Sequence, residues 1–225
     1  MKKYLIIITL LFLSSGCANI ATVVKKGATL RDEKVILVGK LILDPMLEQK
    51  FGSSCGCGIF PSFEEQYENK LFVFLDNDEH HMFTDDLGVI CCPHSVMKAQ
   101  TAIESIQGEY FTVELPREKT FIKGVFVVLT SSSSTNSGLL IRSNIKIDIT
   151  PEDAFIYIGD FIYTLNKKQK FELQVVDNFN RVKEKYSSFV KSSQAMPVPI
   201  QNKTVKNISE IETFFSTMRT TTRAL

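Results

Sequence analysis

Short runs rich in β-branched and aromatic residues make up most of this chain, and they constrain its fold more than any other feature. Runs of this composition bounded by turn residues are typical of β-strands. They occur at 34–43, 70–75, 109–115, 124–130, 139–149, 154–165 and 170–176. Many short strands separated by turn-forming residues favour a sandwich or barrel. The sequence therefore predicts a mainly β protein, with an antiparallel β-sandwich over residues 35–191.

Two of these runs allow finer predictions. Gly39 interrupts the first run, where it indicates a bulge or the close approach of another segment. In the run 154–165, alternation along a continuous strand places four aromatic side chains on one face. These are Phe155, Tyr157, Phe161 and Tyr163. Because isoleucines occupy the other face, we expect both faces of this strand to be buried in the core.

Helical spacing of apolar residues occurs twice near the C-terminus. Residues 177–191 begin with Asp177 as a candidate N-cap, and their apolar residues recur near one face. Ser209 and Glu212 have the spacing of a capping box before a second apolar pattern. We therefore expect a helix packed over the sandwich, and a linker and short C-terminal helix within 192–225. The predicted fold is an immunoglobulin-like or transthyretin-like sandwich with one or two C-terminal helices.

The first sixteen residues have the order of a secretory signal peptide. Two lysines precede the uncharged stretch 4–13, and residues 14–16 are small. A membrane-spanning helix needs about 20 apolar residues. The shorter stretch therefore predicts a signal peptide, residues 1–16, that is removed.

Cys17 follows the small residues directly. The stretch resembles the lipobox of bacterial lipoproteins, because Ser15 and Gly16 match its usual small pair; Ser14 stands where the family usually has a bulky residue. The resemblance implies cleavage before Cys17 and lipidation of that cysteine. Ala18 occupies the position where Asp tends to retain Gram-negative lipoproteins in the inner membrane. The resemblance therefore implies sorting to the outer membrane.

Residues 17–34 mix small, basic and turn residues, and we expect them to form a lipidated tether. The lipid on Cys17 is the predicted attachment to the membrane, with the body facing the periplasm or the cell surface. The chain has 26 basic and 25 acidic residues. This balance gives no electrostatic reason to expect nucleic acid as a partner. Other envelope proteins are the expected partners.

Three segments resemble a loosely defined group of bacterial envelope lipoproteins with β-sandwich bodies. They are GEYFTVELP (108–116), DAFIYIGDF (153–161) and VVDNFNRVKEKY (175–186). The resemblance implies a sandwich and no particular reaction. The sequence also contains no H-E-x-x-H, Walker or G-x-G-x-x-G motif. We therefore expect a non-enzymatic binding or assembly module without a cofactor; an envelope enzyme with an unrecognised site is an alternative.

The remaining four cysteines and the three histidines lie close together in the sequence. They are Cys55, Cys57, Cys91 and Cys92, with His80, His81 and His94. An exported chain meets oxidising conditions, which favours disulfides. Bridges within each close pair would form small, strained rings, so we expect cross-pairing, either 55–91 with 57–92 or 55–92 with 57–91. The alternative is a zinc or copper(I) site formed by these cysteines and His94.

Overall fold

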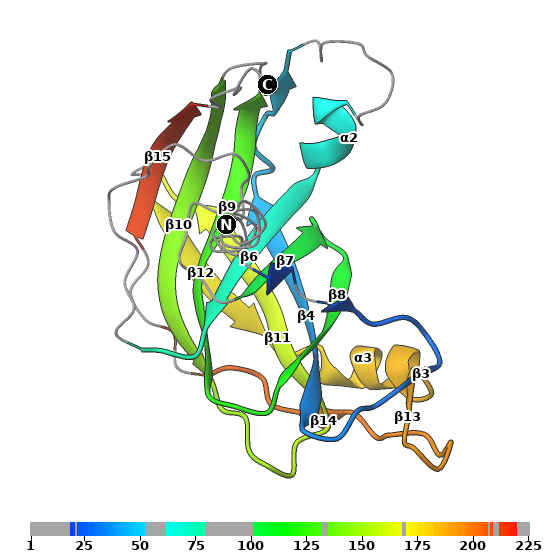
Figure 1. Cartoon of the computed structure of the whole chain (residues 1–225). Coiled ribbons are helices and arrows are strands. Elements are labelled where there is room, and N and C mark those ends of the chain that lie inside the picture. The colour runs from blue at the N-terminus through cyan, green and yellow to red at the C-terminus, as the bar shows by residue number, and fades with distance from the viewer. Residues whose placement is uncertain are drawn as a thin grey trace, which may run out of the picture.

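The computed structural model describes residues 19–20, 22–52, 62–79, 101–131, 135–167, 170–206, 208 and 212–219. The strands are β1 (Asn19–Ile20), β2 (Thr22–Val23), β3 (Ala28–Thr29), β4 (Lys34–Asp44), β5 (Lys50–Phe51), β6 (Lys70–Asp76), β7 (Thr101–Ile106), β8 (Tyr110–Pro116), β9 (Thr120–Ser131), β10 (Thr135–Ile147), β11 (Phe155–Leu165), β12 (Phe171–Val176), β13 (Val190–Lys191), β14 (Gln201–Asn202) and β15 (Glu212–Arg219). The helices are α2 (Phe63–Tyr67) and α3 (Phe179–Tyr186). The predicted mainly β class is confirmed (Figure 1).

Two sheets form the body. One has the order β1-β7-β6-β9-β10-β15, with β5 beside β9, and the other has the order β12-β11-β4-β8-β2, with β14 beside β11. Most pairs of long strands are antiparallel, but β4 and β11 are parallel, with Ile36 opposite Phe155. The predicted sandwich is therefore confirmed, and one parallel pair of long strands lies within its second sheet.

The main apolar core lies between the facing surfaces of the two sheets. Its completely buried members include Val35, Leu37, Val125, Ile141 and Ile145, from β4, β9 and β10. Complete burial of such a side chain contributes about 1.5–3 kcal/mol. At Gly39, an added Cβ would lie 2.5 Å from Cζ of Phe111 in β8. The close approach predicted at this glycine is confirmed.

A second apolar cluster lies on the other face of the sheet that contains β4 and β11. The strands contribute Ile36, Val38, Phe155 and Tyr157, and α3 with the following segment contributes Val182, Tyr186, Val190, Val198 and Ile200. The predicted helix is therefore present and packed, although it ends at Tyr186. Asn178 is its N-cap residue, and the predicted cap, Asp177, accepts a hydrogen bond from the backbone N–H of Phe179 at 2.9 Å.

The aromatic residues of β11 do not share one face. The register between β11 and β4 shifts after Tyr157, where Gly159 has a φ of +116°. Phe155 and Tyr157 belong to the cluster under α3, whereas Phe161 and Tyr163 lie in the core between the sheets. The single aromatic face predicted for this strand is wrong, because a β-bulge inserts one residue and reverses the alternation beyond it.

The C-terminal residues with helical spacing form a strand. In β15, residues from Glu212 to Arg219 pair antiparallel with β10, from Arg142 to Thr135. The predicted short C-terminal helix is therefore wrong for this segment. The long strand β10 presents a row of backbone donors and acceptors that need partners. The segment ETFFSTMR is rich in threonine and phenylalanine, which fit a strand well.

Most of the expected tether is part of the body. β1 pairs with β7 in one sheet and β2 pairs with β8 in the other (Figure 1). Val24 is buried, and its backbone N–H donates to the carbonyl of Thr112 at 2.9 Å. The backbone N–H of Leu30 likewise donates to the carbonyl of Lys191 at 2.7 Å. This corrects the expectation of a tether for the described part of 17–34, because its backbone groups find partners at the sheet edges.

Both helices among the described residues are short. α2 has 5 residues and α3 has 8. Within the part of the chain that the structure describes, neither helix has the length and apolar composition that crossing a membrane requires.

Candidate functional site

The site residues predicted from the sequence lie outside the described residues. They are Cys17, Cys55, Cys57, Cys91, Cys92 and His94, and the neighbouring His80 and His81 lie outside as well. Lipidation, the disulfides and the alternative metal site therefore stay predictions. Among the described residues, no three or more His, Cys, Asp or Glu side chains are grouped so that they could hold a metal ion.

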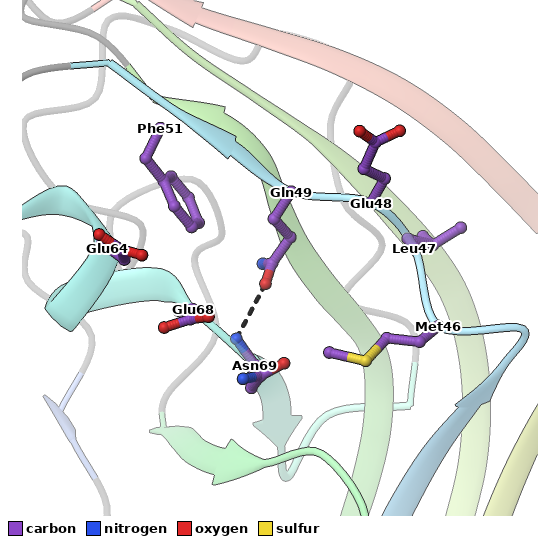
Figure 2. A pocket seen from close by; sticks show the side chains of 8 residues that line it. All are labelled: Met46, Leu47, Glu48, Gln49, Phe51, Glu64, Glu68 and Asn69. Atoms are coloured by element: carbon purple, nitrogen blue, oxygen red, sulfur yellow. Dashed lines mark hydrogen bonds between the residues drawn. The ribbon is translucent and has the colours of Figure 1, made fainter.

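A pocket of about 460 Å³ lies between the segment that follows β4 and helix α2 (Figure 2). Its lining residues are Met46, Leu47, Glu48, Gln49, Phe51, Glu64, Glu68 and Asn69. We call it the α2 pocket. Its volume lies in the range of small-ligand sites, about 300–1,000 Å³. The pocket therefore has room for a small molecule or for a few side chains of a partner.

A capping box fixes the start of α2. The hydroxyl of Ser62 accepts a hydrogen bond from the backbone N–H of Glu65 at 3.2 Å. In return, the backbone N–H of Ser62 donates to the carboxylate of Glu65 at 2.8 Å. These two bonds satisfy donors that the first turn would otherwise leave unpaired. This helix was not among the elements predicted from the sequence, although its S-x-x-E spacing was a usable signal.

Gln49 joins the walls of the α2 pocket. Its Nε2 donates to the carbonyl of Tyr67 at 3.1 Å and to that of Val128 at 2.7 Å. Its Oε1 accepts from the backbone N–H of Asn69 at 2.8 Å, the dashed line in Figure 2. One side chain therefore connects the segment after β4, the end of α2 and strand β9. This gives the pocket a fixed wall.

The chemistry of the α2 pocket combines apolar and acidic groups. Met46 is 53% exposed, and Phe51 lies opposite α2 (Figure 2). Glu64 and Glu68 are exposed on or next to α2, and no described residue forms an ion pair with either of them. Apolar surface beside free carboxylates suits a ligand that carries both apolar and cationic groups.

A buried ionic cluster lies between β4, β8, β11 and the start of α3. Asp160 is 1% exposed, and its Oδ2 lies 2.7 Å from Nζ of Lys40. The hydroxyl of Tyr157 donates to Oδ1 at 2.8 Å, and Nδ2 of Asn178 donates to Oδ2 at 2.7 Å. Tyr110 donates to Oδ2 at 3.3 Å. A buried charge is tolerated only when it is paired in this way.

The cluster keeps its tyrosines protonated. Burial raises the pKa of Tyr157, and the backbone N–H of Asn178 opposes this shift, while the adjacent Asp160 reinforces it. Burial and the charge of Asp160 also raise the pKa of Tyr110. At neutral pH both hydroxyls are therefore donors. The contacts of Asp160 come from groups within the body, so we interpret the cluster as a structural connection that positions α3.

Lys123 is a second buried charge, at 2% exposure in β9. Its Nζ donates to the carbonyl of Glu79 and to Oδ1 of Asn144, each at 2.8 Å. Burial lowers the pKa of Lys123, and the charges of Asp76, Asp78 and Glu79 oppose that shift. This lysine therefore connects β9 and β10 to the segment that leaves β6.

Two further hollows lie near the start of α3, with volumes of about 530 and 490 Å³. Both are lined by Asp177 and Asn202, which are joined by a hydrogen bond of 2.8 Å between Nδ2 and Oδ2. One also contains Arg181, and the other contains Lys203 and Lys206. Polar and charged groups dominate both hollows, in contrast to the mixed lining of the α2 pocket.

Comparison of this chain with protein-family models, curated proteins and solved structures finds no match.

Proposed function

We propose that this protein is a lipid-anchored bacterial envelope lipoprotein whose sandwich is a non-enzymatic binding or assembly module at the outer membrane. One observation carries the proposal: Cys17 directly follows a signal-like segment and lies two positions before Asn19, where the first described strand begins. This position suits a membrane anchor.

Lipidation would make the attachment lasting. Each buried methylene contributes about 0.8 kcal/mol, and a single acyl chain binds a membrane only reversibly. The modification implied by the lipobox adds a diacylglyceryl group and an acylated amino group to Cys17. Two or three chains would hold the body at the membrane throughout its life.

Replacing the anchor tests the proposal. The variant Cys17→Ser should move from the membrane fraction to the soluble fraction, whereas Cys55→Ser, the same chemical change elsewhere, should stay with the membrane. Mass spectrometry of the mature N-terminal peptide should show acyl groups on Cys17. An unmodified peptide, or tight membrane association of Cys17→Ser, would contradict lipid anchoring.

The α2 pocket supports the binding role. Its wall is fixed by Gln49, and its carboxylates at Glu64 and Glu68 face solvent beside the apolar Met46. We propose that it receives a cationic and apolar segment of another envelope protein. Fixed walls reduce the conformational entropy that binding costs.

Photocrosslinking in cells tests this role. A photoreactive amino acid at Met46 should capture a defined partner, and the same residue at Met196 should not, although Met196 is similarly exposed at 57%. Glu64→Gln with Glu68→Gln should reduce the captured amount several-fold. Identical capture from both positions would contradict a role for the pocket, and a robust hydrolase or transferase activity of residues 18–225 would contradict a non-enzymatic module.

A further inference from the structure

The first described residues run along one side of the sandwich. β1 borders β7 at the edge of one sheet, and β2 borders β8 at the edge of the other (Figure 1). The opposite edges of the two sheets are β15 and β12. The chain therefore crosses from one sheet to the other between β1 and β2, on the side of the sandwich where these two strands form the sheet edges. We call this the N-terminal side.

Covalent geometry limits the distance between Cys17 and the first residue of this side. Ala18 alone separates Cys17 from Asn19. Neighbouring Cα atoms are about 3.8 Å apart, so the Cα atoms of Cys17 and Asn19 can be at most about 7.6 Å apart. A lipid on Cys17 would therefore bring the N-terminal side itself to the membrane surface.

The N-terminal side carries groups that suit an interface between lipid and water. Val23 is 59% exposed, although Val24 is buried beneath it. Lys25 and Lys26 follow and are both exposed. The carboxylate of Glu114 on the neighbouring strand is paired with Arg31 at 3.3 Å. An exposed valine beside two ammonium groups can place its apolar part among acyl chains and its charges among phosphates.

We infer that Val23, Lys25 and Lys26 rest on the membrane and contact anionic phospholipid headgroups. The inference depends on the proposed lipid anchor, since the chains on Cys17 supply the attachment that orients the body. The edges β12 and β15 then lie away from the membrane. The partner of this surface is a phospholipid leaflet with negative charge.

Photocrosslinking to lipid tests the orientation. The lipidated full-length protein is reconstituted in vesicles of phosphatidylethanolamine and phosphatidylglycerol, with a photoreactive residue at Val23. The same residue at Gln174, exposed in β12, is the negative control. The photoreactive residue at Ala18, next to the lipidated Cys17 in the sequence, is the positive control. Lipid adducts from Val23 should exceed those from Gln174 several-fold.

Charge variants test the headgroup contact. Lys25→Glu with Lys26→Glu should reduce the Val23 adducts several-fold, as should neutral phosphatidylcholine vesicles. The control is Lys167→Glu with Lys170→Glu, since both lysines are exposed near the start of β12. This change should leave the lipid adducts from Val23 unchanged.

Two results would overturn the inference and are distinguishable. Vesicle-bound, acylated protein with adducts from Ala18 but no more from Val23 than from Gln174 would refute the orientation and leave the anchor in place. Protein without acyl groups on Cys17 that does not sediment with vesicles would refute the proposed function, and the orientation with it.

Discussion

The hydroxyl of Tyr157 donates a 2.8 Å hydrogen bond to Oδ1 of Asp160, although the two residues are three apart in one strand. Residues three apart in a regular strand point to opposite faces. Gly159, with a φ of +116°, forms part of the bulge that brings both side chains to the face covered by α3. The bulge, the buried carboxylate and the helix therefore form one unit.

The two completely buried tyrosines of β11 should respond differently to loss of the hydroxyl. Tyr157→Phe removes a hydrogen bond to a charged group and should lower the free energy of unfolding by about 1.5–3 kcal/mol. The hydroxyl of Tyr163 has no hydrogen-bond partner among the described residues. Tyr163→Phe should therefore be neutral or stabilising. Urea unfolding measures both, and equal losses would contradict the assigned hydrogen bonds.

Lys40 and Asp160 should be energetically coupled. Lys40→Met leaves a buried carboxylate without its counter-ion and should cost about 3–5 kcal/mol. Adding Asp160→Asn should recover part of that loss. The control is Lys50→Met, because Lys50 and Glu48 form an exposed pair that should contribute no more than about 1 kcal/mol. A double-mutant cycle in urea measures the coupling, and strictly additive losses would disprove it.

Two glycines with positive φ should differ in their tolerance of alanine. A Cβ at Gly159 would lie 2.5 Å from Cγ1 of Val175, whereas one at Gly108, with a φ of +76°, meets nothing within 4 Å. Gly108→Ala should cost about 1–2 kcal/mol from backbone strain alone. Gly159→Ala should cost about 1–3 kcal/mol more, because its Cβ overpacks against Val175. Thermal unfolding should therefore show the larger fall in Tm for Gly159→Ala; the reverse order would argue against the bulge.

Alkaline pH should unfold the protein as its buried tyrosines ionise. Burial raises the pKa of Tyr110, Tyr157, Tyr163 and Tyr186. Their pKa in the unfolded chain is about 10. A raised folded pKa contributes stability below pH 10 that is lost as the pH rises toward the folded pKa.

Tyrosinate absorbance recorded together with circular dichroism checks this expectation. The chain has six tyrosines, and the four with raised pKa should ionise only as the β signal disappears. Reversible ionisation of these four tyrosines near pH 10 with an intact β signal would contradict their raised pKa values.

The long strands could be predicted because their composition directly reflects burial on both faces. The bulge in β11 could not be predicted from alternation, because alternation assumes a continuous strand; the glycine within the run was its only local sign. The two S-x-x-E patterns show a different limit. The pattern at Ser62 starts a helix, whereas Glu212 of the other begins a strand, because β10 supplies a partner that no local pattern can reveal.

The candidate site depends on contacts between distant residues. The side chain of Gln49 forms a hydrogen bond with the carbonyl of Val128, 79 positions away. No sequence pattern connects residues so far apart. Lys40 and Asp160 left a clearer sign, since each is a single charge inside an apolar run. Charges in such runs need a partner, so their presence was informative although their pairing was not. The predicted cysteine cluster gave no sign of the α2 pocket, because the two share no residue.

The N-terminal strands also set how the body responds to force. β1, β2 and β3 are each held by two paired residues, whereas β4 pairs along most of its length with β8 and β11. A pull on Cys17 would therefore peel the three short strands first and reach β4 last. Released up to β4, residues 19–33 could span about 50 Å, given about 3.4 Å per residue. Under the proposed lipid anchoring, the N-terminal segment would therefore lengthen before the sandwich unfolds.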